Sequence, residues 1–165
     1  MVQFQVLTWD ARDENEDHII RIFGKTMKGE SVCVTTKFVP YFFVKIPGTM
    51  TPNSFIQYVK RTCPDIIEID VVEAKDMEGF QNGEKSFFLQ IHCNNLLSRR
   101  HISNRLRKHI TGLSCKLKIF EANLDPVLRL MHRTGIQSTG WVDTGETCDR
   151  AYHTKAEIDL QCEDW

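Results

Sequence analysis

The spacing of apolar residues between positions 41 and 120 switches repeatedly between the two-residue period of a strand and the longer period of a helix. It predicts strands at 41–46, 66–73, 86–93 and 116–120, and helices at 52–62 and 97–110. This β-α-β-β-α-β order is that of ferredoxin-like and RNA-recognition-like units, which place both helices on one face of an antiparallel sheet. The expected fold class is therefore α+β.

Three alternating segments come before this unit. They predict strands at 2–9, 18–25 and 31–38, with a hairpin turn at Lys28 and Gly29. An acidic run at 10–17 is interpreted as a connector. The N-terminal part is thus expected to form an antiparallel sheet of its own.

The segment that follows the unit predicts a short helix at 126–134. Asp125 is a suitable N-cap, Pro126 fits the first helical position, and Gly135 can adopt the left-handed conformation that ends a helix. The helical period places Val127, Leu130 and Met131 on a buried stripe. Arg129 and Arg133 lie on another side, where they are expected to reach solvent or a partner.

Composition limits the function classes. The 165 residues are 41% hydrophobic, enough for the core of one domain, and a formal net charge of −1 gives no overall attraction to nucleic acid. The six cysteines lack zinc-site spacing and are interpreted as reduced thiols of an intracellular protein. The sequence shows neither a signal peptide nor an apolar run of membrane-spanning length, so a soluble protein that is not secreted is expected.

A local basic patch lies on the predicted helix at 97–110. Arg100, Arg107 and Lys108 point away from its apolar stripe, so they either contact nucleic-acid phosphates or form an ordinary solvated face. Tyr41 and Phe87, on predicted strands, are the aromatic candidates for base stacking, with packing as the alternative. The strand around Phe87 matches the RNA-recognition signature only in part.

Three segments resemble family B DNA polymerases. They are FEANLDPVLRLMH at 120–132, continued by TGI at 134–136 and GWV at 140–142, FVPYFFV at 38–44, and IRIFG at 20–24. Their order and spacing are similar to those in the polymerase N-terminal domain, most of all in the large-DNA-virus members and then in eukaryotic polymerase delta. Phe120, Ala122 and Leu130 depart from the usual Tyr, Ser and Phe of that pattern, which removes two hydroxyl groups.

The resemblance implies a noncatalytic polymerase N-terminal domain at 1–142, with strands at 2–38, the β-α-β-β-α-β unit at 41–120, and a helix and strand at 125–142. It implies that 143–165 is a connector toward an absent exonuclease domain. The implied partners are the remaining polymerase and exonuclease domains, which Arg129, Arg133 and Trp141 would contact, and template DNA. The parent enzyme would use magnesium, and it would act inside a host cell, in the cytoplasm or the nucleus.

No catalytic or metal residues are expected in this chain. The polymerase carboxylate motifs are absent from the sequence, and Asp159 is followed by Gln161 where an exonuclease Asp-x-Glu would have glutamate. The isolated chain is therefore expected to be inactive and to hold no cofactor. The alternative function is a freestanding module that binds single-stranded nucleic acid on an RNA-recognition-like sheet.

Overall fold

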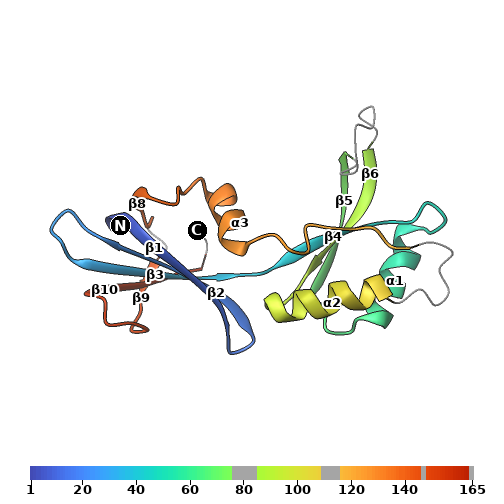
Figure 1. The fold of residues 1–165 in the computed structure, drawn as a ribbon, viewed down its shortest axis with the longest axis horizontal. Helices are drawn as coiled ribbons and strands as arrows, with labels where there is room; N and C mark the ends of the chain where they lie inside the picture. The colour runs from blue at the N-terminus through green and yellow to red at the C-terminus, as the bar shows by residue number, and fades with distance from the viewer. Residues whose placement is uncertain (76–84, 109–115, 146–147, 164–165) are drawn as a thin grey trace. The chain divides into compact units, whose positions relative to one another are not determined.

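The computed structural model describes residues 1–75, 85–108, 116–145 and 148–163, and it divides into two compact units (Figure 1). Unit 1 combines Met1–Phe38 with Leu124–Trp165, and unit 2 is Val39–Asn123. Both units build strands and helices around sheets that are mainly antiparallel, so the predicted α+β class is confirmed. No helix among the described residues is both long enough and apolar enough to cross a membrane.

Unit 2 has the element order that the sequence predicts. Its elements are β4 (Tyr41–Lys45), α1 (Pro52–Thr62), β5 (Glu68–Lys75), β6 (Lys85–His92), α2 (Leu96–Lys108) and β7 (Ile119–Phe120). The four strands form an antiparallel sheet in the order β5-β6-β4-β7. The predicted continuation of α2 to residue 110 lies outside the described residues.

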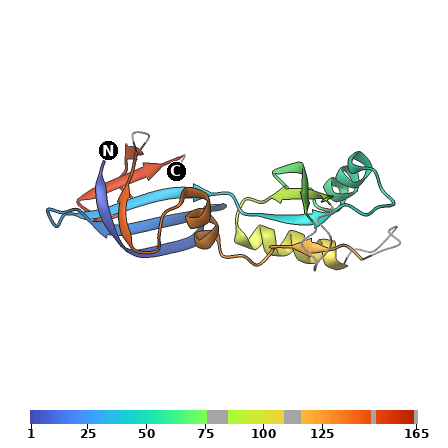
Figure 2. The same cartoon turned by 90° about the horizontal axis from the view of Figure 1, so that it is seen from above.

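Both helices of unit 2 cover one face of this sheet (Figure 2). The buried side chains of that core come from both helices and from the middle strands: Phe42, Val44, Phe55, Val59, Leu89, Ile91, Ile102 and Leu106. Because side chains alternate along a strand, Tyr41 and Phe43 point to the other face. Helix α1 begins where the Thr51 hydroxyl accepts a hydrogen bond from the Ser54 amide at 3.3 Å.

The described residues of unit 1 form a six-stranded sheet with one helix. Its elements are β1 (Gln3–Glu14), β2 (Asp17–Lys25), β3 (Ser31–Phe38), α3 (Pro126–Thr134), β8 (Gly140–Asp143), β9 (Cys148–Arg150) and β10 (Ile158–Cys162). The strand order is β8-β1-β2-β3-β10-β9, and only the β10–β3 pair among them is parallel. Gly24 is required in β2 because a Cβ atom there would overlap the Gln5 carbonyl oxygen and the Phe4 ring.

The acidic run at 10–17 is a hairpin rather than a connector. Strand β1 extends to Glu14 and β2 begins at Asp17, with Asn15 and Glu16 in the left-handed region at φ 47° and 74°. The Arg21 guanidinium donates to both carboxylate oxygens of Glu14 at 2.7 and 2.8 Å. Charge pairing across the two strands therefore stabilises this hairpin.

Helix α3 has the predicted bounds and the predicted ends. The Asp125 carboxylate accepts from the Val127 amide at 2.7 Å, and Gly135 closes the helix in the left-handed conformation at φ 75°. Leu130 is fully buried as expected, and Leu128 is 62% exposed. Arg129, in contrast, is only 8% exposed, so the expectation that its side chain reaches solvent or a partner is wrong for this residue.

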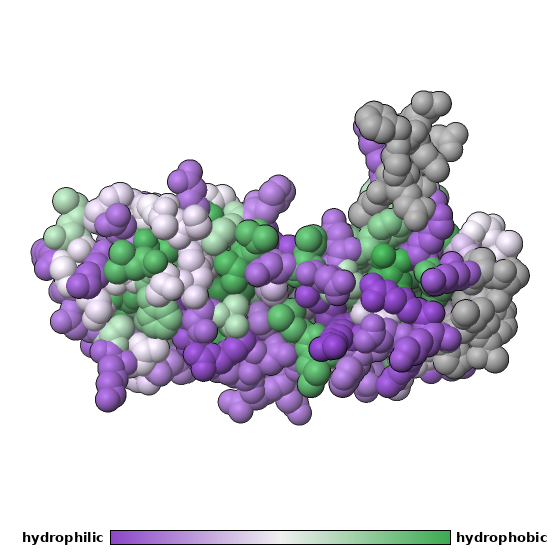
Figure 3. Space-filling view, viewed as in Figure 1, coloured by the Kyte–Doolittle hydropathy of each residue, from purple (hydrophilic) through white to green (hydrophobic). Residues whose placement is uncertain are grey.

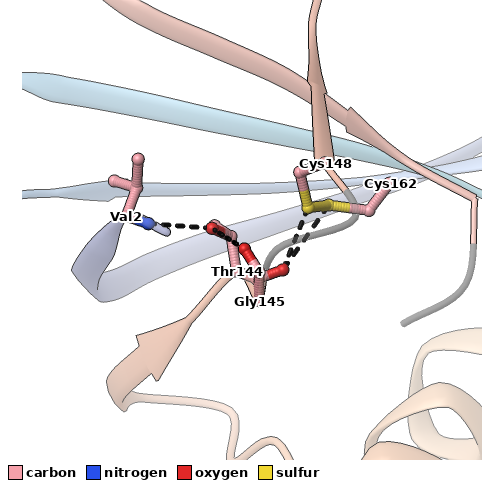
Figure 4. Close-up of a disulfide and its surroundings, with 5 residues drawn as sticks. All are labelled: Val2, Thr144, Gly145, Cys148 and Cys162. Carbon is pink, nitrogen blue, oxygen red and sulfur yellow. Dashed lines mark hydrogen bonds between the residues drawn. A yellow bond between two sulfur atoms is a disulfide. The ribbon is translucent and has the colours of Figure 1, made fainter.

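The tail at 143–165 is not a loose connector in its described part. Strand β10 pairs in parallel with β3 from Ile158 to Cys162, and β9 pairs with β10 (Figure 1). Cys148 and Cys162 form a disulfide between β9 and β10, which corrects the expectation of reduced thiols for these two residues (Figure 4). Near it, the Val2 amide donates to the Thr144 hydroxyl at 3.0 Å and ties the chain start to the end of β8 (Figure 4).

Candidate nucleic-acid interface

The helical layer of unit 2 carries cations without acidic neighbours on the same helices. The sequences of α1 and α2, PNSFIQYVKRT and LLSRRHISNRLRK, contain no aspartate or glutamate. Arg100, Arg107 and Lys108 are exposed on α2, while Ile102 and Leu106 on the same helix are buried in the core. Hydrophilic side chains cover the surface over α2 (Figure 3). The layer is thus positive although the whole chain is nearly neutral.

The ends of the two helices bring further cations to this layer. The Arg105 guanidinium donates to the Thr62 carbonyl oxygen at 3.4 Å, which links the C-terminal ends of α1 and α2. Lys60 and Arg61 lie in the last turn of α1, and Arg107 and Lys108 in the last turn of α2. Cations at these positions are favoured by the helix dipole. At the start of α2, the Asn95 side chain accepts from the Ser98 amide at 2.8 Å.

Tyr41 and Phe87, the predicted stacking pair, do not share a face of the sheet. Tyr41 pairs with His92, so it lies on the face opposite the helices, whereas Phe87 alternates with Phe88 and lies on the helix side. Phe87 is 52% exposed. A single strand of nucleic acid therefore cannot stack on both rings across one open face.

The surroundings of Tyr41 are aromatic. Its ring meets Phe43 edge to face at 5.8 Å between centroids and lies tilted at 5.9 Å from the His92 ring. The first contact joins neighbours on one face of β4 and the second joins paired residues of β4 and β6, so both are ordinary aromatic packing within a sheet. Tyr41 is therefore not an obvious stacking site. The predicted cations gather on the outer surface of α2 instead.

The remaining predicted contact residues belong to unit 1. The Arg133 guanidinium lies over the Phe38 ring at 5.8 Å, a cation–π contact within the unit. Trp141 is 51% exposed and borders a hollow of about 430 Å³ that residues 134–137 and 140–143 line. The Trp9 indole donates to the Ser138 carbonyl oxygen at 2.9 Å and holds the loop before β8. Of the three predicted contact residues, Trp141 is the most suitably placed for a large apolar contact.

The described free cysteines are not activated nucleophiles. Burial raises the pKa of the Cys33 and Cys63 thiols, and it raises the pKa of Cys93 to about 12. All three side chains are inaccessible to solvent. They remain protonated at neutral pH and act as small core residues.

One side-chain cluster was missed by the sequence analysis. Glu68 and Asp70 of β5 and His92 of β6 bring their ligand-type atoms within 4.8 Å of one another. The positions 68, 70 and 92 match no short metal-binding motif. The two carboxylates at i and i+2 on a strand do lie on one face of the sheet, but this spacing alone does not bring a histidine to them. The missing information was the register of β5 against β6.

Relatives of the chain agree on one kind of protein. Over 95% of its length it is 26% identical to a DNA polymerase of Pyramimonas orientalis virus, of which it covers 15%. Over 86% of its length it is 31% identical to the DNA polymerase delta catalytic subunit of Schizosaccharomyces pombe, of which it covers 14%. No family model matches the chain.

A solved structure has the same fold. The family B DNA polymerase from the archaeon Pyrobaculum calidifontis matches 99% of this chain with a TM-score of 0.75 and 19% identity, over 20% of the archaeal chain. The chain is thus similar over most of its length to DNA polymerases of viruses and to eukaryotic polymerase delta, and it has the fold of a part of a family B DNA polymerase. The resemblance seen in the three sequence segments is thereby confirmed. The chain spans about 15% of the length of the curated polymerases that it matches. These matches do not favour the alternative function, a freestanding binding module.

Proposed function

We propose that this chain is the noncatalytic N-terminal domain of a DNA-directed DNA polymerase and helps to guide the template strand during DNA replication. Similarity to viral and eukaryotic polymerases over most of the chain, but over only about 15% of their length, is the observation that carries this proposal. Unit 2 is the ferredoxin-like unit of this domain, which its strand order β5-β6-β4-β7 supports.

The remaining polymerase and exonuclease domains are the proposed protein partners. Trp141 offers them an exposed aromatic anchor, and Arg133 offers an exposed charge on the same unit. Magnesium belongs to the catalytic domains of the parent enzyme, where paired carboxylates would bind it. The whole enzyme would act inside the cell, in the cytoplasm or the nucleus of a host if it is viral.

The proposed template contact is the outer surface of α2. Phosphates of a single strand would pair with Arg100, Arg107 and Lys108, all of which are exposed. Such contacts position the strand without reading its sequence. Each lost contact should lower the slope of log affinity against log salt by about 0.7 for a single strand.

Fluorescence anisotropy with a labelled oligothymidine tests this contact. Replacement of Arg100, Arg107 and Lys108 with alanine should weaken binding and reduce the salt slope by about 2. The matched control replaces Lys25, Lys28 and Lys155, exposed cations of unit 1, and should change the slope much less. Equal effects of the two triple variants would refute a localised template contact.

A separate assay tests the noncatalytic role. The 165-residue chain should neither extend a primer nor shorten a 3′ end with magnesium or manganese. Activity that co-purifies with the chain and disappears in an Asp159→Asn variant would overturn this assignment.

A further inference from the structure

We propose that Glu68, Asp70 and His92 form a binding site for one divalent first-row transition-metal ion, with zinc as the best-suited ion. The three side chains offer two carboxylates and one imidazole whose ligand-type atoms lie within 4.8 Å of one another. Histidine nitrogen and carboxylate oxygen are both zinc ligands. The site lies on the face of the unit 2 sheet opposite the helices and is independent of the proposed template contact.

The sheet fixes the relative positions of the three side chains. Glu68 pairs directly with His92 across β5 and β6, and Asp70 lies two residues along β5 on the same face. The Ile67 amide donates to the His92 carbonyl oxygen at 3.2 Å, so the backbone is hydrogen-bonded at the site itself. Ligands on paired strands are better preorganised than ligands on loops.

The distances suit a metal ion. The His92 Nε2 atom lies 3.1 Å from an Asp70 carboxylate oxygen. Donors that share one ion at about 2.1 Å are roughly 3.0–3.4 Å apart in octahedral or tetrahedral geometry. Small side-chain rotations of the Glu68 carboxylate would complete a set of three ligands and leave the exposed side for water.

The local charge also favours a cation. Glu68 and Asp70 are both exposed, and within the described part of the chain neither forms an ion pair with lysine or arginine. Two neighbouring carboxylates repel one another, and a divalent ion between them removes that repulsion. The imidazole ligand selects zinc, cobalt or nickel over magnesium, which prefers oxygen ligands.

Binding of the ion requires no chemical change other than coordination and the possible loss of one proton from His92. The neutral His92 ring coordinates the ion through Nε2 and keeps its proton on Nδ1. No bond other than the metal–ligand bonds is formed, and any proton displaced from Nε2 passes to water. The Tyr41 ring, which lies tilted at 5.9 Å from the His92 ring, restricts the imidazole on its other side.

Calorimetric titration of the full chain with zinc, after removal of metal by a chelator, tests the proposal. One site is expected, and the His92→Gln and Asp70→Asn variants should each bind zinc at least about tenfold more weakly, because loss of even a supporting residue weakens metal sites by about 10–100-fold. Glu73→Gln is the matched control, since Glu73 is exposed on β5 but lies on the other face. It should leave the affinity unchanged.

Paramagnetic NMR locates the ion without any variant. Sub-stoichiometric manganese should selectively broaden the amide signals of Ile69, Asp70, Ile91 and His92, and excess zinc should restore them. Magnesium at the same concentration should not compete. The proposal is overturned if zinc binds the His92→Gln and Asp70→Asn variants as tightly as the wild type, or if broadening centres on other histidines.

Discussion

The Asp159 carboxylate accepts two hydrogen bonds from Thr154, one from the backbone amide at 2.6 Å and one from the hydroxyl at 3.1 Å. Asp159 is buried in β10, and the contact fixes the loop that joins β9 to β10. Replacement by alanine leaves the partly buried Thr154 amide without its acceptor. The free energy of unfolding should fall by about 1–3 kcal/mol, measured by urea denaturation.

Asp149→Ala is the control for this change, because Asp149 is exposed on the neighbouring strand β9. It should alter stability by less than about 0.5 kcal/mol. Equal stabilities of the Asp159→Ala variant and the wild type would mean that Asp159 does not hold the tail in place.

The role of Asp159 illustrates what the sequence could and could not predict. Helix α3 was predicted with its bounds because its signals, Asp125, Pro126 and Gly135, are local in the chain. Strand β10 was missed because one of its two partner strands is β3, whose residues are more than a hundred positions away. Its short pattern of mixed polar and apolar residues is typical of a loop until that partner is known.

The candidate sites differ in the same way. The exposed cations of α2 were predicted because the helical period alone separates Arg100, Arg107 and Lys108 from the apolar stripe. The separation of Tyr41 from Phe87, and the meeting of Glu68 with His92, depend on strand register. Register is set by tertiary pairing, which one sequence does not specify.

Leu130 and Leu128 provide a matched pair on α3. Leu130 is fully buried and Leu128 is largely exposed on the same helix. Leu130→Ala should lower the free energy of unfolding by about 2–5 kcal/mol, because it removes buried apolar surface and leaves a cavity. Leu128→Ala should cost less than about 0.5 kcal/mol in the same denaturation experiment. Similar losses for the two variants would contradict the orientation of the helix.

The Glu14–Arg21 pair should make stability depend on pH. The Arg21 hydrogen bond lowers the pKa of Glu14 in the folded protein, so folding favours the ionised carboxylate. The resulting stabilisation is complete above the unfolded pKa of about 4.3 and is lost as the pH falls through the lower folded pKa. Denaturation curves between about pH 6 and pH 3 should therefore decline more steeply for the wild type than for Glu14→Gln.

Arg21→Gln completes the thermodynamic cycle for this pair. Once Arg21 is absent, the Glu14→Gln substitution should change the slope of stability against pH much less, because Arg12, 3.5 Å from Glu14, makes only a smaller contribution to the lowered pKa. If Glu14→Gln flattens the profile equally in both backgrounds, the interaction with Arg21 is not the cause.

The Cys148–Cys162 disulfide predicts a redox-dependent stability of unit 1. It closes a loop between residues 14 positions apart. In the chain-entropy account, a cross-link around a loop of this size contributes about 3 kcal/mol, so dithiothreitol should lower the free energy of unfolding by up to that amount. The Cys148 sulfur lies 3.0 Å from the Thr144 carbonyl oxygen, and a free thiol there could donate to it and offset part of the loss.

The Cys148→Ser/Cys162→Ser double variant separates this effect from other actions of the reductant. Its stability should not respond to dithiothreitol. Thiol titration in denaturant, without reductant, should give the same number of free thiols for the wild type and the double variant. Prior reduction should add two thiols to the wild type alone. A wild type that already shows two more thiols than the variant before reduction would mean that Cys148 and Cys162 are not joined, and β9 would then be held to β10 by its strand pairing alone.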